Sequence, residues 1–505
     1  MKNKKKTTDY GLGELAIPIM DILSTGLLKL LSILVDITYE LLSKYIFLDS
    51  PHKDFEKIER KSLGVRKSTL TDNAIGYSVT AKRNLMGGEL DKSKHTAIIG
   101  ASGSGKTVLL DTLIYEDMKQ GKPVVYLDPK GDRGTLLTFI HLCKLTGRDF
   151  YIFSEHWQGE GACSLNPVKE GTSTNIADRL FHAFTWSEEH YAQICHDALE
   201  FAVAKLKESN TSITLDSIYD ELLNISDPKQ LREDVTYKRD DIGGILTRLN
   251  QIRRSDFGKL LNDPNGLSFS EIRNSRKCVY IGLSVLGYAE IARSIGKVIL
   301  GDISYCAYDI YKHISPDSNN LTSLGIYIDE LSALITDEFI EILNKCRGAK
   351  MELTFAFQSP SDIAKYDPEL CTQVLENASN WFIFKQRIES GAKIFSEAIG
   401  TMESKKQTVR VLDGEIQDQG SQRIVEELIS HPNILKNLNV GQCVLLRHFP
   451  SRIDLLNVKY IDPKVLIANT KFIKKEVVTK IMAREATVNT VDLSRKNKRG
   501  GSIDN

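Results

Sequence analysis

The chain has 505 residues, of which 41% are hydrophobic, so it has enough apolar side chains for large cores in roughly two to four domains. Lysine and arginine together number 66, as do aspartate and glutamate, so the formal net charge is zero. This balance excludes a globally basic protein and requires any DNA site to be a local patch. The eight cysteines are scattered, with no C-x-x-C pair and no His/Cys cluster at zinc spacing, which indicates a reducing, cytosolic protein without a structural metal.

Residues 1–50 begin with a lysine-rich segment and continue as an apolar stretch, Leu12 to Leu48, that charged side chains interrupt. The longest run without a charge, Ile22 to Leu28, is far shorter than the ~20 apolar residues that a spanning helix needs. At about 100° per residue, the charges fall on one helical face and the leucines on the other. The pattern predicts an amphipathic helix that lies on a membrane surface or packs on a partner helix. Packing on its own domain is the alternative, and a cleaved signal peptide is not favoured because the apolar part is too long and too charged.

A glycine-rich segment fits the pattern G-x-x-x-x-G-K-[ST] and joins a predicted strand, His95 to Ile99, to a helical run that starts at Val108. Its residues are Gly100, Ala101, Ser102, Gly103, Ser104, Gly105, Lys106 and Thr107. A loop at the N-terminus of a helix offers free backbone N–H groups to phosphates. Lys106 is expected to reach the β- and γ-phosphates, and the Thr107 hydroxyl to help hold Mg²⁺. The segment therefore predicts a site for ATP and Mg²⁺; the alternative, a chance turn, does not account for the strand and helix on either side.

Residues 51–170 are expected to form the first part of the nucleotide-binding domain. A second short strand is predicted at Val124 to Leu127, followed by Asp128-Pro-Lys-Gly-Asp132 and a helix from Gly134 to Leu145. A third strand is predicted at Phe150 to Phe153. Strands and helices that alternate in this way are typical of an α/β fold with a parallel sheet covered by helices on both faces.

Residues 171–272 contain no strand signal, and their apolar residues recur at helical spacing over 176–207, 213–224 and 239–253. Turn signals separate these runs, for example at Asp227-Pro228. The pattern predicts an all-α domain inserted into the sheet domain.

The second part of the nucleotide-binding domain is expected over 273–465. A long helix is predicted from Ala289 to Tyr311, and further strands are predicted at Cys278–Leu283, Leu324–Ile328, Leu353–Phe357, Trp381–Phe384, Cys443–Leu446 and Leu455–Val458. The remaining residues, 466–505, form a polar tail rich in lysine and arginine, which predicts disorder.

The buried strand Leu324 to Ile328 ends in two adjacent acids, Asp329 and Glu330, at the edge of the sheet where ligands bind in α/β proteins. This is a Walker B pattern, in which Asp329 would hold Mg²⁺ and Glu330 would orient and deprotonate the attacking water. The alternative is that the two acids cap the following helix.

Three further residues are predicted to act in hydrolysis. Gln358, at the end of the strand Leu353–Phe357, is expected to contact the γ-phosphate or its water, with a simple helix cap by the following serine as the alternative. Arg347 precedes that strand and is predicted to stabilise the transition state of a neighbouring subunit. An exposed, solvated arginine is the alternative, and Arg387 is the second candidate for the same role.

Several of these segments resemble TraD/TraG-type coupling proteins of type IV secretion and conjugation, which belong to the FtsK/HerA group of motors. The segments are Gly100–Thr107, Tyr126–Asp132, Tyr327–Glu330, Ala356–Ser359 and Ser430–Lys436, and the similarity covers residues 80 to 460. The resemblance implies a RecA-like ATPase domain in a hexameric ring at the cytoplasmic face of the bacterial inner membrane. The ring would use ATP to feed single-stranded DNA, with its relaxase, into the secretion channel. The N-terminal segment departs from the family, whose members usually carry a transmembrane hairpin there.

The predicted function is therefore a DNA-stimulated ATPase and translocase that couples a relaxosome to inner-membrane components of a type IV channel, with membrane association through residues 1–48. One alternative is a soluble HerA/FtsK-like translocase in chromosome or defence work, and the other is a docking platform whose ATP binding only sets assembly. DNA binding is expected to be independent of base sequence because a motor must grip every nucleotide that it passes. Lys130 is predicted to contact DNA, with structural pairing to Asp128 or Asp132 as the alternative.

Overall fold

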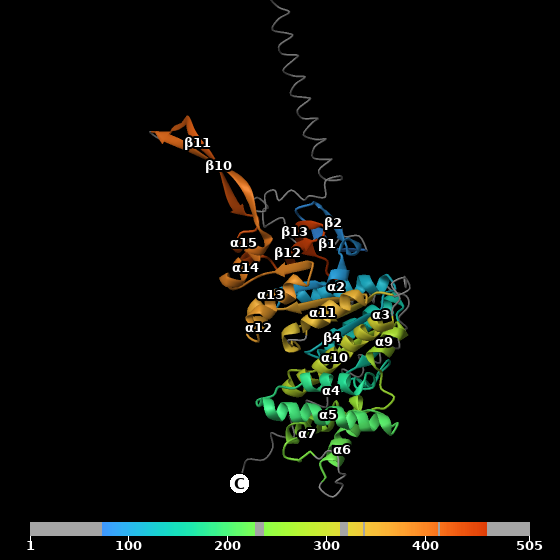
Figure 1. Cartoon of the computed structure of the whole chain (residues 1–505). Helices are drawn as coiled ribbons and strands as arrows, with labels where there is room; N and C mark the ends of the chain where they lie inside the picture. Colours follow the sequence, from blue (N-terminus) through green and yellow to red (C-terminus); the bar gives the residue numbers. More distant parts are fainter. Residues whose placement is uncertain (1–72, 228–236, 314–321, 337–338, 413–414, 462–505) are drawn as a thin grey trace, which may run out of the picture.

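A computed structural model describes residues 73–227, 237–313, 322–336, 339–412 and 415–461, with side chains except over 405–422 (Figure 1). The predicted helix in 1–50 and the predicted tail 466–505 lie outside the described residues. The main feature is a sheet of eleven strands in the order β2-β1-β13-β12-β9-β3-β8-β7-β4-β6-β5. The strands are β1 (Ala74–Ser78), β2 (Arg83–Met86), β3 (Thr96–Ile99), β4 (Val124–Asp128), β5 (Phe150–Phe153), β6 (Cys278–Gly282), β7 (Leu324–Ile328), β8 (Met351–Phe357), β9 (Asn380–Phe384), β12 (Gln442–His448) and β13 (Ser451–Val458).

The strands from β9 to β5 pair in parallel, whereas β12, β13, β1 and β2 continue the sheet in antiparallel pairing beyond β9. The parallel strands are buried on both faces, as in β7, where all five residues are buried. Strands buried in this way are continuous apolar runs, which is why the sequence predicts them within a few residues. The expected α/β fold with a parallel sheet is confirmed.

Helices cover both faces of the sheet (Figure 1). On one face, α2 and α3 pack with Leu109 and Phe139 against the strand residues Tyr126 and Tyr280. On the other face, α10 and α11 pack against alternate strand residues such as Leu127. The helices outside the insertion are α2 (Lys106–Lys119), α3 (Arg133–Thr146), α10 (Ala289–His313), α11 (Phe339–Gly348), α12 (Pro360–Ala364), α13 (Pro368–Glu376), α14 (Glu389–Ile399) and α15 (Pro432–Asn437). Among the described residues, no helix has both the length and the apolar character to cross a membrane.

Between β5 and β6 the described chain forms helices, which lie together on the side of the molecule away from β1 and β2 (Figure 1). They are α4 (Ser173–His182), α5 (Glu189–Glu208), α6 (Leu215–Ile225), α7 (Gly243–Arg254), α8 (Gly258–Leu261) and α9 (Phe269–Ser275). The run expected over 176–207 is two helices, because α4 ends at His182 and the chain turns before α5. These helices share one apolar core with α10 and one face of the sheet.

A two-stranded antiparallel hairpin, β10 (Thr401–Leu412) and β11 (Glu415–Leu428), projects from the body between α14 and α15 (Figure 1). No pattern in the sequence predicts this hairpin. The hairpin is rich in charged and amide residues, and the run from Thr401 to Gln407 has one large apolar residue, Met402. An alternation of apolar and polar residues is the signal that predicts a strand, and this run lacks it.

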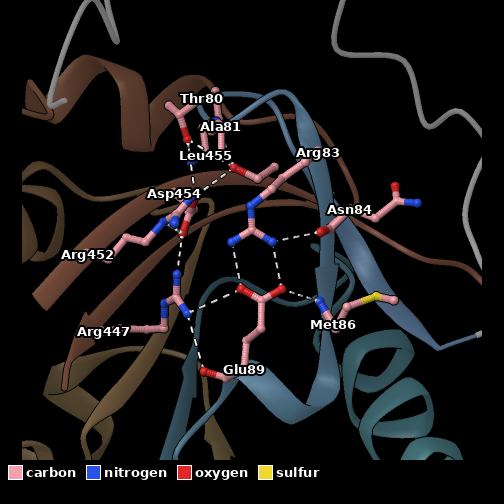
Figure 2. A network of polar contacts seen from close by, with 11 residues as sticks. Thr80, Ala81, Arg83, Asn84, Met86, Glu89, Arg447, Arg452, Asp454 and Leu455 are labelled. Carbon is pink, nitrogen blue, oxygen red and sulfur yellow. Dashed lines mark hydrogen bonds and ion pairs between the residues drawn. The ribbon is translucent and has the colours of Figure 1, made fainter. Parts of the chain in front are cut away.

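An ionic network that is buried at Asp454 and partly exposed at Arg83 ties the first strands of the described chain to the last ones (Figure 2). Asp454 on β13 is fully buried and accepts hydrogen bonds from Arg452 at 2.9 Å and from Arg447 at 3.0 Å. Arg447 also lies 3.9 Å from Glu89, which forms a 2.7 Å ion pair with Arg83 on β2. A buried charge without a partner is costly, so the network favours the observed pairing of β2, β1, β13 and β12 over other registers.

Candidate nucleotide-hydrolysis site

The order of the parallel strands brings the predicted site residues to one edge of the sheet. Strand β8 lies between β3, which leads into the glycine-rich loop, and β7, which ends at Asp329 and Glu330. Gln358 follows β8, and Lys130 follows β4, the neighbour of β7 on its other side. The carboxyl ends of parallel strands share an edge, so residues more than 200 positions apart in the chain meet here.

The glycine-rich loop closes against the end of β9. The Ala101 N–H donates to the Lys385 carbonyl oxygen at 3.0 Å, and a Cβ on Gly100 would lie 2.5 Å from the Phe384 Cβ. Gly105 precedes α2 with a φ of 112°, in the region that favours glycine. The helix then starts at Lys106, so the loop presents a helix N-terminus to a bound anion.

Lys106 is buried, with 8% of its surface exposed, and its Nζ donates to the Gly100 carbonyl oxygen at 2.6 Å. A second contact, to the Ala101 carbonyl oxygen, is 3.4 Å long. Burial lowers the pKa of Lys106, although the carboxylates of Glu330 and Asp329 partly offset this effect. The ammonium thus lies inside the loop, where phosphate oxygens could replace the carbonyls as its acceptors.

Asp329 and Thr107 form a pair suited to Mg²⁺. The Thr107 hydroxyl lies 3.4 Å from Asp329 Oδ2, while Asp329 Oδ1 is buried without a hydrogen-bond partner. A buried carboxylate oxygen without a partner is costly, and hydroxyl and carboxylate oxygens are the ligands that Mg²⁺ prefers. These two residues therefore fit the metal ion that a nucleotide would bring.

Glu330 is held at the same edge by neighbours on both sides. Gln358 Nε2 donates to one carboxylate oxygen at 3.0 Å, and the Ser332 hydroxyl donates to the other at 2.9 Å. The Glu330 backbone has a φ of 71° and a ψ of 64°, a left-handed conformation that is rare for residues other than glycine. The structure thus joins the predicted base and the predicted sensor by a direct hydrogen bond, and such backbone outliers cluster at functional sites.

Two other acids at this edge were not predicted from the sequence to act in nucleotide binding or hydrolysis. Asp128 is buried and accepts a 2.6 Å hydrogen bond from the Tyr280 hydroxyl. Asp111 lies on α2 one helical turn after Thr107, a spacing that could have marked it. Burial, together with the Asp329 and Asp128 carboxylates, raises the pKa of Asp111 to about 8. A side chain with this pKa is mostly protonated at pH 7 and so adds no full negative charge.

The two candidate arginines lie at different edges of the sheet. Arg387 Nη2 donates to the Ser102 carbonyl oxygen in the glycine-rich loop at 3.3 Å. Arg347 is near the end of α11 and lines a cavity of about 190 Å³ with His95, which precedes β3. It is therefore at the amino ends of the strands, away from the site of its own chain, and a role in hydrolysis requires a second subunit.

Lys130 is also in the site. Its Nζ lies 3.4 Å from Asp329 Oδ2 and 3.9 Å from Glu330 Oε2. The side-chain partners considered from the sequence, Asp128 and Asp132, are not the ones that the ammonium contacts. The Asp128 carboxylate instead accepts a hydrogen bond from the Lys130 backbone N–H at 2.9 Å.

The fold and this edge define a P-loop NTPase of the RecA-like kind. Two family models match the chain, the central domain of helicase HerA over residues 89–303 and the TraM recognition site of TraD and TraG over residues 323–438. No curated protein sequence is significantly similar to the chain. The two matches identify the chain as TraD/TraG-like, with a P-loop domain of the HerA kind, so the family resemblance is confirmed.

Solved structures share this fold at low sequence identity. The bacterial conjugative coupling protein TrwBdeltaN70, unbound, has a TM-score of 0.58 at 16% identity, over 78% of this chain and 91% of that one. TrwB in complex with ADP and Mg²⁺ has a TM-score of 0.54 at 16% identity, with the same coverage. VirB4 of Thermoanaerobacter pseudethanolicus has a TM-score of 0.52 at 12% identity, over 78% of this chain and 99% of that one.

Proposed function

We propose that this protein is an ATP-driven DNA translocase that acts as a coupling protein in conjugation. As a hexamer at the cytoplasmic face of the inner membrane, it would deliver single-stranded DNA with its relaxase to a type IV secretion channel. The observation that carries the proposal is the row of Gln358, Glu330 and Asp329 beside the glycine-rich loop at one edge of the sheet. The match to TraD and TraG and the coupling-protein fold support the conjugative role.

ATP and Mg²⁺ are the proposed cofactors, in line with the ADP and Mg²⁺ of the TrwB complex. Residues 100–107 would cradle the phosphates with backbone N–H groups, and Thr107 and Asp329 would hold the metal ion. Mg²⁺ would neutralise the charge that develops on the phosphates. Lys106 would stabilise the same charge once its ammonium leaves the Gly100 carbonyl oxygen.

Glu330 is proposed to take a proton from the attacking water. Its two carboxylate oxygens accept hydrogen bonds from Gln358 and Ser332, and these bonds hold the base in one orientation. Gln358 links β8 to this base, and a nucleotide that contacts Gln358 would change that hydrogen bond. The site therefore has a way to report nucleotide state along β8.

The test is ATPase activity of the full chain with and without single-stranded DNA, together with membrane fractionation of cells that express it. A coupling translocase should hydrolyse ATP faster in the presence of DNA of any sequence, and its turnover should fall as the salt concentration rises. The protein itself should be found in the membrane fraction. Turnover stimulated by DNA in a wholly soluble protein would favour a HerA/FtsK-like translocase. Nucleotide-dependent assembly without DNA-stimulated turnover would favour the docking platform.

A further inference from the structure

Lys130 is the cation that contacts the Walker B acids within the described residues. Its ammonium is 3.4 Å from Asp329 Oδ2 and 3.9 Å from Glu330 Oε2, and these are the ion pairs of the two acids within the described residues. Lys106, the other cation of the site, instead donates to the carbonyl oxygen of Gly100. The negative charge of the two acids is therefore balanced from the β4 side.

The turn that carries Lys130 is fixed by contacts from β4 and from the segment after β6. The Asp128 carboxylate accepts hydrogen bonds from the Lys130 N–H at 2.9 Å and the Asp132 N–H at 3.1 Å. The Val285 N–H donates to the Pro129 carbonyl oxygen at 2.7 Å. Gly131 has a φ of 61°, and a Cβ on it would lie 2.5 Å from the hydroxyl oxygen of Ser284. A turn held on both sides presents the Lys130 side chain to β7 in a defined direction.

The Lys130 ammonium lies on the same carboxylate that fits a metal ion. Asp329 Oδ2 is 3.4 Å from both the Lys130 Nζ and the Thr107 hydroxyl, and Oδ1 is buried without a partner. A divalent ion between Thr107 and Asp329 would face a positive charge a few ångströms away. Two cations at that separation repel strongly in a partly buried site.

We propose that Lys130 is a positioning residue that serves as the internal counter-ion of the metal site. Its ammonium neutralises Asp329 and Glu330, and this ammonium would leave Asp329 Oδ2 when the site takes up a divalent ion with the nucleotide. This inference rests on the proposed function because it requires a metal-nucleotide complex at residues 100–107. It assigns Lys130 to the hydrolysis site and not to DNA.

The experiment measures binding of Mn²⁺ to the full chain in the presence of ADP, by electron paramagnetic resonance of the free ion. The variants are Lys130→Met and Lys130→Gln, which remove the charge, and Lys130→Arg, which keeps it. Lys144→Met is the matched control because it removes a lysine from the adjacent helix α3, where Lys144 pairs with Glu160 at 2.7 Å. The melting temperature of each variant without metal and nucleotide is measured in parallel.

Loss of the competing charge is expected to tighten Mn²⁺ binding by about tenfold in Lys130→Met and Lys130→Gln. The same two variants should melt at a lower temperature than the wild type without metal, because Asp329 and Glu330 then repel each other without a counter-ion. Excess Mn²⁺ and ADP should remove this difference. Lys130→Arg and Lys144→Met should bind Mn²⁺ as the wild type does.

Unchanged or weaker Mn²⁺ binding in both charge-removing variants would overturn the inference and leave the proposed function intact. In that case, a loss of DNA stimulation in the same variants would assign Lys130 to DNA. If the wild-type chain bound no Mn²⁺ with ADP, the proposed function would fall together with the inference. The two failures are therefore distinguishable in one titration.

Discussion

At the residue scale, the site depends on a few side chains whose positions are fixed by the protein's own contacts. Glu330 combines a left-handed backbone with hydrogen bonds from Gln358 and Ser332. Asp329, next to it, is buried with one oxygen that has no partner. Preorganised groups of this kind avoid the cost of reorientation during reaction, which is why hydrolysis can depend on positioning and electrostatics.

We expect Glu330→Gln to bind ATP normally and to lower the hydrolysis rate by about 10²- to 10⁴-fold, because the amide keeps the shape of the side chain but cannot accept the proton. Lys106→Ala should also lower the hydrolysis rate. Unlike Glu330→Gln, it should weaken ATP binding too, because the phosphates lose their main point charge. Fluorescent-nucleotide binding and phosphate release, measured on both variants, separate the two effects. Wild-type turnover in Glu330→Gln would show that another group is the base.

The two arginines predict opposite defects. Arg387→Ala should weaken nucleotide binding by isolated subunits a few-fold, since Arg387 contacts the glycine-rich loop of its own chain. Arg347→Ala should leave that binding intact and depress hydrolysis in the assembled ring, because Arg347 can act only on a neighbour. Binding to dilute protein and turnover at high protein concentration provide the two measurements. Normal turnover in assembled Arg347→Ala would leave Arg347 as a solvated surface residue.

At the element scale, a buried carboxylate on α2 joins this helix to the segment before β3 and to the sheet. Asp117 on α2 is 2% exposed, pairs with Lys92 at 2.7 Å and accepts a 2.6 Å hydrogen bond from the Tyr327 hydroxyl on β7. Burial alone would raise the pKa of Asp117, but the ammonium groups of Lys92 and Lys122 lower it below its usual value. The carboxylate form is thus preferred in the folded protein.

Asp117→Asn should therefore lower the free energy of unfolding by about 3 kcal/mol at pH 7, because the Lys92 ammonium remains buried without its counter-charge. A lowered folded-state pKa contributes stability above the unfolded pKa of about 3.9, and this stability is lost as pH falls through the folded pKa. Urea unfolding should show a constant difference in the free energy of unfolding between variant and wild type from pH 7 down to about pH 4. Between pH 4 and pH 3 this difference should shrink. Glu341→Gln, in an exposed pair with Lys345, should change stability by less than about 1 kcal/mol throughout.

Elements with a continuous apolar run could be predicted from the sequence, and elements defined by long-range pairing could not. The bounds of β7 agree with those expected because all of its residues are buried. The hairpin β10–β11 lacks such a run, and its strands are defined by pairing with each other. Strand order, which brings Gln358 and Lys130 to the same acids, depends on the pairing of β3 with β8 and of β4 with β7. These pairings join residues more than 200 positions apart and leave no local pattern.

The same distinction holds within the site. The glycine-rich loop and the acid pair are local patterns with a known mechanism, so their residues could be named from the sequence. The contact of Lys130 with Asp329 joins residues 199 positions apart, and the hydrogen bond from Tyr280 to Asp128 joins residues 152 apart. These residues come into contact only because the sheet places their strands close together.

At the scale of the whole molecule, the described chain is a P-loop domain with a helical insertion at one end and an antiparallel extension of the sheet at the other (Figure 1). Residues 1–48, proposed to attach the protein to the membrane, precede this extension. The glycine-rich loop is held by contacts with the sheet, such as the hydrogen bond from the Ala101 N–H to the Lys385 carbonyl oxygen after β9. Attachment and nucleotide binding should therefore be separable.

Deleting residues 1–48 should release the protein from membranes and leave nucleotide binding unchanged. The physical reason is that each charge at mid-bilayer costs about 2.5 to 3.5 kcal/mol, so the charged stretch favours surface attachment over spanning. In the full-length protein, carbonate or high salt should release it from the membrane pellet, as measured by immunoblotting of fractions. Retention after carbonate, with both ends of the segment protected from protease, would show that the segment spans the membrane with its charges paired.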